Sequence, residues 1–295
     1  MAGNGGREPR ARTCGDRARS LWAMTRRTPP RPLDVEQLFP EVAPFRRQAV
    51  RLHPRAGSPT YRDSSVGGPL LWPQDEAWPV CPEHHGSAMV PVVQVHAADA
   101  LGLVPFPTGC DLLQVLWCPR SHDGCWVAPE VHWRDAAAVA NVREAPAVPA
   151  ADVYGHVPRP CVVHPELVTE YPSWDLPDEL WDALESRFEQ VEAETGWDYH
   201  YHLSTAPGTK LGGYPGWCQD PQWPDCSVCG EQMAHLLTVE SWEADAESRR
   251  TWTPVEDQDV HYEATGLMLG DAGGVYLFEC RSCPGRPVKE RYDCA

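Results

Sequence analysis

No long hydrophobic run occurs in the sequence, and this absence narrows where the protein can act. No segment approaches the ~18 consecutive apolar residues that a membrane-spanning helix requires, and no apolar core of a signal peptide follows the N-terminal arginines. We therefore expect a cytoplasmic protein without a membrane partner. In that reducing compartment, the 12 cysteines are expected to bind metal rather than to pair as disulfides.

Positive charge is also scarce. The chain has 25 basic residues against 42 acidic ones, a formal net charge of −17, and its only lysines are Lys210 and Lys289. Affinity for nucleic acid comes from Lys and Arg side chains that neutralise phosphates, so this composition argues against a nucleic-acid partner. An acidic protein instead favours a partner that is neutral or basic.

Common catalytic motifs are missing as well. The sequence contains no H-E-x-x-H and no G-x-S-x-G segment. Gly208, Thr209 and Lys210 look like part of a P-loop, but the earlier glycine and the following Ser or Thr are absent. These absences favour a protein that is not an enzyme.

Two cysteine pairs are the clearest signal that is present. Cys226 and Cys229 belong to one C-x2-C-G turn, and Cys280 and Cys283 follow about fifty residues later. Each pair directs two thiols toward one point, and four thiolates in two such pairs are typical of structural Zn²⁺ sites. Because a closed set of four ligands leaves no position for a substrate, we expect this site to stabilise the fold.

The segment before the first of these pairs has an earlier counterpart. Residues 66–81 (VGGPLLWPQDEAWPVC) match residues 211–226 (LGGYPGWCQDPQWPDC) at a constant offset of 145 positions. The match includes a glycine, a tryptophan, Gln-Asp, Trp-Pro and the final cysteine. Such self-similarity predicts two fused copies of one structural unit. We expect the matched tryptophans to pack as core over the cysteine turns rather than to line a ligand groove; they are Trp72, Trp78, Trp217 and Trp223.

The earlier copy has an altered set of candidate ligands. Cys81 and His84 occupy the positions of the first pair, and Cys118 ends an apolar stretch as Cys280 does. The fourth position falls at Ser121, which cannot serve as a ligand. A mixed Cys/His zinc site and a copy that has lost its metal both remain open. The site would consist of Cys81, His84, Cys118 and His122, with His85 or Cys125 as substitutes.

An enzymatic alternative depends on this first site. Three protein ligands and a water molecule around Zn²⁺ would have the form of a catalytic centre. A metal-dependent hydrolase acting there is therefore the second candidate function.

The hydrophobic patterns predict an α+β fold with mostly antiparallel strands. Residues 1–32 hold eight Arg and two acids without apolar periodicity, so we expect a disordered basic arm. A first repeat unit follows at 33–135 and a connecting segment at 136–176. Residues 177–295 then form an amphipathic helix and the second repeat unit with its zinc site.

Individual elements follow from the same patterns. One apolar stripe predicts a helix over 177–194, with Asp175 as its cap and Gly196 as its end. His200 and His202 lie in an alternating segment that reads as a strand, and we expect no special role for them. The other predicted strands are 49–53, 89–95, 111–117, 233–239, and a hairpin of 265–269 with 275–278.

These motifs together resemble the YwqG-like family, also called domain of unknown function 1963. The resemblance covers roughly residues 45–294, and its first copy spans Gly67 to Gln94. Lys210 to Trp217, ahead of the cysteine turn, also resembles the programmed cell death protein 2 family. The residues that carry the resemblance are Gly212, Gly213, Trp217, Trp223, Pro224, Cys226, Cys229, Gly230, 233–239 and 275–283.

The resemblance implies a function only by analogy. Members of the second group act as dedicated chaperones that hold a nascent ribosomal protein, and an acidic chain suits a basic client of that kind. This implies a zinc-stabilised protein-binding module with a chaperone-like role toward a basic protein. The zinc itself is expected from the cysteine spacing rather than from the resemblance.

Overall fold

The computed structural model describes residues 25–84, 86–122, 127–147, 155–258, 264–270 and 273–294. Its strands are β1 (Arg47–Arg51), β2 (Arg55–Ala56), β3 (Ser65–Val66), β4 (Val90–His96), β5 (Leu112–Trp117), β6 (Pro129–Arg134), β7 (Cys161–Val162), β8 (Glu166–Glu170), β9 (Lys210–Gly212), β10 (Ala234–Glu240), β11 (Gly274–Glu279) and β12 (Val288–Asp293). Its helical segments are α2 (Val35–Leu38), α3 (Asp178–Thr195), α4 (Arg249–Trp252), the π-helical turn η4 (Tyr199–Leu203), and the 3₁₀ turns η1 (Pro40–Phe45), η2 (Ala136–Ala138) and η5 (Val255–Asp257).

The strands form two six-stranded sheets. The first sheet has the order β12-β11-β10-β9-β1-β8, and the second has the order β2-β7-β3-β4-β5-β6. All of the strand pairs described are antiparallel. The predicted α+β class with mostly antiparallel strands is therefore confirmed.

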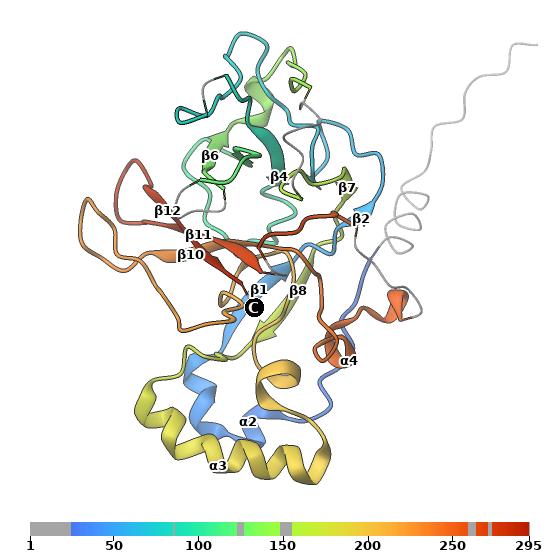
Figure 1. Cartoon of the computed structure of the whole chain (residues 1–295), viewed down its shortest axis with the longest axis vertical. Helices are drawn as coiled ribbons and strands as arrows, with labels where there is room; N and C mark the ends of the chain where they lie inside the picture. Colours follow the sequence, from blue (N-terminus) through green and yellow to red (C-terminus); the bar gives the residue numbers. More distant parts are fainter. Residues whose placement is uncertain are drawn as a thin grey trace, which may run out of the picture.

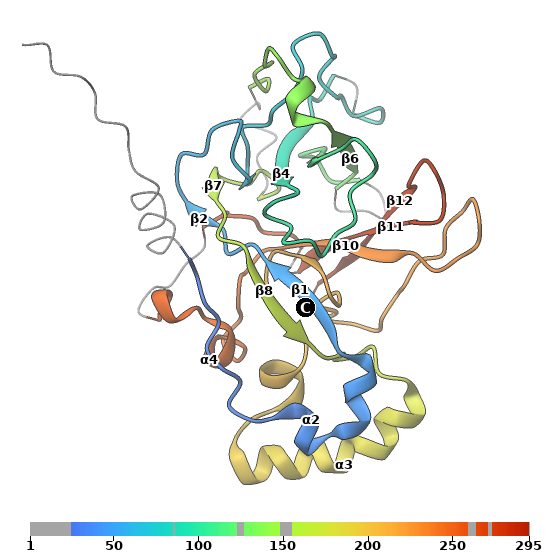
Figure 2. The same cartoon turned by 180° about the vertical axis from the view of Figure 1, so that it is seen from behind.

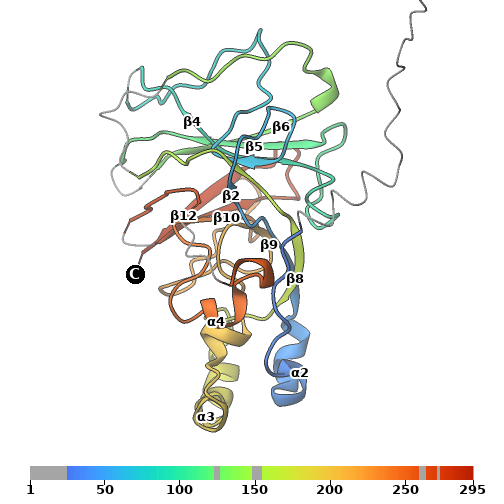
Figure 3. The same ribbon diagram turned by 90° about the vertical axis from the view of Figure 1, so that its right-hand side faces the viewer.

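The two sheets stack face to face and share one core. Figure 3 shows them as layers, with β4, β5 and β6 in one layer and β10 and β12 in the other. Buried side chains from both sheets meet between the layers; they include Val50, Val93, Val115, Leu211, Leu237 and Leu277. Burial of this apolar area is the main force that holds the sheets together.

The same succession of strands occurs in both sheets. β3-β4-β5-β6 in the second sheet has the order and direction of β9-β10-β11-β12 in the first. Each central pair also contains a register shift at a corresponding place, between Pro91 and Val93 in β4 and between His235 and Leu237 in β10. Predicted strands 89–95, 111–117, 233–239 and 275–278 overlap β4, β5, β10 and β11.

Helices gather at the end of the molecule farther from the second sheet (Figures 1 and 3). Their core includes Phe188 of α3, which stacks on Tyr199 at 4.0 Å between ring centroids and meets Phe39 edge-on at 4.8 Å. Figure 2 shows α2 and α3 together beyond one end of the neighbouring strands β1 and β8. The predicted helix is confirmed, and Gly196 ends it in a left-handed conformation.

Three local predictions are wrong. Asp175 does not cap α3; its carboxylate Oδ1 accepts hydrogen bonds from the indole nitrogens of two tryptophans instead. The segment with His200 and His202 is a helical turn, because Asp198 caps it through Tyr201 N at 2.7 Å. The strand at 265–269 is only a single bridge between Leu269 and Gly273, since β11 pairs with β10 and β12.

Residues 25–32 of the predicted arm contact the body, whereas 1–24 lie outside the described residues. The Thr28 backbone N–H and hydroxyl donate to the carboxylate of Glu166 at 2.7 and 2.6 Å. Arg26 pairs with Asp257 at 2.9 Å. Composition indicated a solvated segment, but these specific acids of the body provide partners for it.

Two buried histidines predict sensitivity to acid. Burial lowers the pKa of His53 and of His235 to about 3, whereas a histidine in the unfolded chain titrates near about 6.5. Below that pH the unfolded chain binds protons that the folded chain does not. Between about pH 6.5 and about pH 3, each histidine therefore lowers the free energy of unfolding by about 1.4 kcal/mol for every unit by which the pH falls.

Urea unfolding at a series of pH values measures this effect. We expect the free energy of unfolding to fall as the pH drops from about 6.5 to about 4.5. In His235→Gln the slope should be smaller by about 1.4 kcal/mol per pH unit. An unchanged slope in the variant would show that His235 accepts a proton in the folded chain.

Candidate metal centres

Strand pairing brings the four cysteines of the two C-x2-C pairs together. The turn with Cys226 and Cys229 precedes β10, Cys280 directly follows β11, and β10 and β11 are paired neighbours. The Cys226 N–H donates to Glu231 O at 2.8 Å and Gly230 N–H donates to Cys226 O at 2.9 Å, which closes the turn. Gly230 adopts a φ of 76°, which suits glycine.

The four sulfur atoms have a spacing that fits a tetrahedral metal. Cys226 Sγ lies 3.9 Å from Cys283 Sγ, and Cys229 Sγ lies 3.5 Å from Cys280 Sγ. All four lie within 4.8 Å of one another. A tetrahedral ion with Zn–S bonds of about 2.3 Å would place its ligands about 3.8 Å apart. The four predicted ligands of this site are thus brought together and could hold a metal ion.

The thiols differ in electrostatic environment. Backbone N–H groups of Cys229 and Val228 lower the pKa of Cys226 to about 7, and Val228 N lies 3.4 Å from its sulfur. Burial raises the pKa of Cys283 to about 12. A bound cation would reverse this second effect, because metal coordination deprotonates thiols.

The mixed set of cysteines and histidines predicted from the sequence forms a second cluster. Cys81 Sγ lies 3.7 Å from His84 Nδ1 and 3.6 Å from His122 Nε2. His84 Nδ1 in turn lies 3.3 Å from Cys118 Sγ. These four ligand atoms also lie within 4.8 Å of one another. The substitutes considered from the sequence, His85 and Cys125, lie outside the described residues.

Groups around the first cluster orient its ligands. The ring of His122 meets Glu83 Oε2 through Nδ1 at 3.0 Å, which leaves Nε2 directed at Cys81. A carboxylate on the far nitrogen of a ligating histidine is a frequent feature of zinc sites. The His84 backbone N–H donates to Cys81 Sγ at 3.3 Å. Glu83 was not among the predicted site residues, although its place within the Cys81–His84 turn was a usable signal.

Trp72, Trp78 and Trp217 are buried, as predicted, and Trp223 packs against the cluster that contains Cys226. Trp217 also borders a cleft, which the sequence did not predict. Trp72 is fully buried and lies 5.2 Å from Trp78 between ring centroids. Trp217 packs against Tyr276 and Phe278 in the cluster that contains the buried cysteines. In that cluster of buried side chains, aromatic rings pack directly with Cys226, Cys280 and Cys283.

Within the described ranges, the two clusters are the only groups of three or more His, Cys, Asp or Glu side chains that could share an ion. His200 and His202 do not belong to either. His200 Nδ1 lies 2.7 Å from Ser173 Oγ, and His202 is buried.

Comparisons with known proteins add no assignment. No protein-family model and no curated protein matches this chain. The resemblance to YwqG-like proteins therefore stays a prediction. Among the described helices, none combines the length and the apolar character needed to cross a bilayer.

Proposed function

We propose that this chain is a zinc-stabilised protein-binding module with a chaperone-like role toward a basic client. The observation that carries the proposal is the convergence of two sets of four Cys and His ligand atoms, each within 4.8 Å. One set consists of four cysteine sulfurs and the other of two sulfurs and two imidazoles, and both ligand types are ones that Zn²⁺ prefers.

The proposal includes two fused copies of one unit. Equal strand order in the two sheets and equivalent register shifts in β4 and β10 support it. In the proposed first copy, the turn with Cys81 and His84 precedes β4, and Cys118 follows the paired strand β5. In the second copy, the turn with Cys226 and Cys229 precedes β10, and Cys280 follows the paired strand β11. The metal thus ties together the ends of two adjacent strands.

The geometry favours structural metal over catalytic metal. Each cluster offers four protein ligands, which fill a tetrahedral shell and leave no open position for water or substrate. This arrangement gives no support to the alternative of a metal-dependent hydrolase at Cys81, His84, Cys118 and His122. A binding role remains the better conclusion.

Charge supports a basic client. The exposed face of α3 carries seven acidic side chains and Arg187 as its one basic residue. Opposite charges on two proteins accelerate their encounter and suppress wrong partners. The acids concerned are Asp178, Glu179, Asp182, Glu185, Glu189, Glu192 and Glu194.

Affinity capture from a native lysate tests this function. We expect the wild-type chain to enrich one basic protein, and the enrichment to fall at high salt. The triple variant Glu185→Gln, Glu189→Gln, Glu192→Gln should lose most of it while it keeps its metal. Two results would contradict the proposed client. One is that the wild-type chain enriches no specific protein from the lysate, and the other is that the variant enriches the same basic protein to the same extent.

A further inference from the structure

A cleft of about 760 Å³ lies between the first sheet and the helical segments at one end of the molecule. Its size falls within the range of small-molecule sites, about 300–1,000 Å³. The cleft is separate from both metal clusters, although Trp217 borders it as well as the four-cysteine cluster. Its walls come from segments far apart in the sequence: 173–174, 200–201, 205–207, 216–218, 240, 242, 244–246 and 248–249.

Aromatic side chains stand open to solvent in this cleft. Trp174 is 48% exposed and Tyr201 is 50% exposed. Trp174 stacks on His200 with ring centroids 4.2 Å apart and planes 18° apart, which fixes its orientation. Trp217 and Trp242 add two further indoles to the lining. Exposed, preoriented aromatic faces of this kind attract organic cations through the ring quadrupole.

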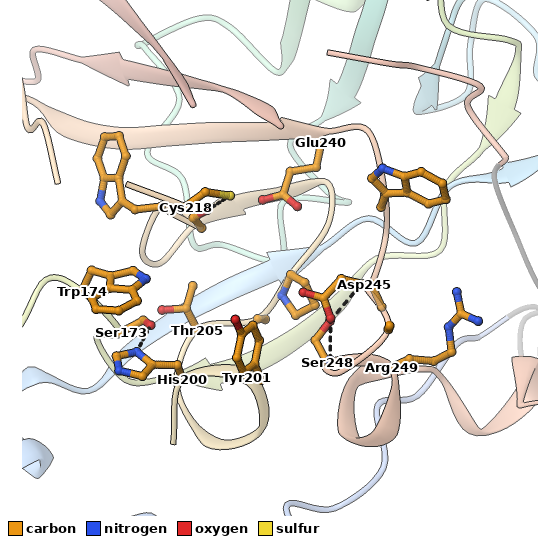
Figure 4. A pocket seen from close by; sticks show the side chains of 17 residues that line it. Ser173, Trp174, His200, Tyr201, Thr205, Cys218, Glu240, Asp245, Ser248 and Arg249 are labelled. Atoms are coloured by element: carbon orange, nitrogen blue, oxygen red, sulfur yellow. Dashed lines mark hydrogen bonds between the residues drawn. The ribbon is translucent and has the colours of Figure 1, made fainter. Parts of the chain in front are cut away.

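A carboxyl group faces the same space. Figure 4 shows the side chain of Glu240, at the end of β10, directed toward Thr205 and Tyr201. Its one hydrogen bond in the described structure is a long one of 3.4 Å, from Gly208 N to Oε2. The other oxygen lies over Gly216, where an added Cβ would approach it to 2.7 Å.

No cation of the described chain neutralises Glu240. Lys210, whose charge acts on Glu240, donates its hydrogen bonds to Glu170 at 2.6 Å and to Ala206 O at 2.5 Å instead. Burial consequently raises the pKa of Glu240 to about 8. A carboxyl group held in this condition gains stability when a cation enters beside it.

The other charged groups of the cleft are already engaged. Asp245 accepts hydrogen bonds from the backbone N–H groups of Glu247 and Ser248 at 2.8 and 2.6 Å. Arg249 lies at the opposite end of the cleft from Trp174 (Figure 4). The acidic group near the exposed aromatic rings that lacks an ion-pair partner is therefore the carboxyl group of Glu240, which an entering cation would favour in its ionised form.

We propose that this cleft binds an organic cation, a guanidinium or alkylammonium group, between the aromatic side chains of Trp174 and Tyr201 and the carboxylate of Glu240. The cation supplies the missing counter-charge and covers the exposed rings. It belongs either to a free small molecule or to a side chain of a bound peptide. The lining of the cleft contains no metal ligand and no residue of α3.

Titration of the full-length, metal-loaded chain with N-acetyl-arginine amide tests the proposal, with tryptophan fluorescence or calorimetry as the readout. N-acetyl-citrulline amide is the matched probe, because it has the same shape without the charge. We expect the citrulline probe to bind at least about tenfold more weakly, as the loss of one charge-assisted hydrogen bond implies.

Variants assign the binding to these residues. We expect Glu240→Gln to weaken binding of the arginine probe about tenfold, whereas Glu144→Gln, an exposed acid outside the cleft, has no effect. If Glu240→Gln does not fold, Trp174→Leu provides the same test at an exposed position. Equal binding of both probes, no binding by the wild type at millimolar concentration, or full binding by both cleft variants would overturn the proposal.

A peptide identifies the source of the cation. A five-residue peptide with capped ends, one central arginine and otherwise uncharged residues should bind more tightly than the free probe if the natural ligand is a protein side chain. Equal or weaker binding of the peptide indicates a small-molecule ligand. In either case the Glu240→Gln variant must reduce the affinity.

Discussion

The double variant Cys226→Ser, Cys229→Ser is expected to lose cooperative unfolding near 25 °C. Apparent binding free energies of structural zinc reach about 10–16 kcal/mol in small domains, while a whole domain is stable by only about 5–15 kcal/mol. Without the metal, Cys280 and Cys283 are left as buried thiols beside Phe278. The ends of β10 and β11 then have no cross-link.

Near-UV circular dichroism and urea titration measure this loss. Cys110→Ser, Cys294→Ser is the matched control, because both residues are half-buried cysteines outside the two clusters. The control should unfold like the wild type, within about 0.5 kcal/mol. Chelation of the wild type should reproduce the effect of the cluster variant. A cluster variant as stable as the control would exclude a structural metal at this site.

Lys210→Met is expected to destabilise the fold by about 3–5 kcal/mol. Lys210 and Glu170 are both fully buried, and Lys210 Nζ lies 2.6 Å from Glu170 Oε1. The Glu170 carboxylate also accepts hydrogen bonds from Tyr214 N at 2.8 Å and Ala206 N at 3.1 Å. Removal of the ammonium leaves this charge buried without a counter-ion.

The chain provides its own control for this variant. Lys289, the other lysine, is bound only to Asp225 O at 2.7 Å in an exposed contact. We expect Lys289→Met to change the free energy of unfolding by less than about 0.5 kcal/mol. The double variant Lys210→Met, Glu170→Gln should lose less unfolding free energy than Lys210→Met alone, because neither buried charge is then present. If the two lysine variants were equally stable, the buried pair would not be ionised.

The sequence predicted best where a pattern is short and local. Apolar runs located β4, β5, β10 and β11, and the C-x2-C spacing located the four cysteines that converge. The mixed cluster was also found, because Cys81 and His84 keep the offset of the second copy. In each case the physical cause, strand burial or metal-ligand spacing, operates over a few residues.

Predictions failed where distant contacts decide the structure. Alternation of apolar and polar residues suggested a strand around His200, but Tyr199 stacks on Phe188 of α3 and the segment turns into a helix. Asp175 looked like a helix cap, yet the indole N–H groups of Trp217 and Trp223 donate to it.

The cleft was not predictable from the sequence for the same reason. Its lining combines short segments from 173 to 249 that no local pattern connects. In the sequence, Glu240 is an ordinary acid at the end of a predicted strand. Only the fold shows that Lys210 is paired with Glu170 and therefore does not pair with Glu240. Tertiary structure alone leaves this carboxyl group without a counter-charge.

Metal analysis of the purified chain is the most direct test of the two proposed zinc centres. Elemental mass spectrometry after dialysis against metal-free buffer should give two zinc ions per chain, one for each four-ligand cluster. His84→Ala should remove one of them and leave the four-cysteine site loaded. A wild-type chain that is folded without zinc, and that does not take up zinc when it is added, would contradict the account.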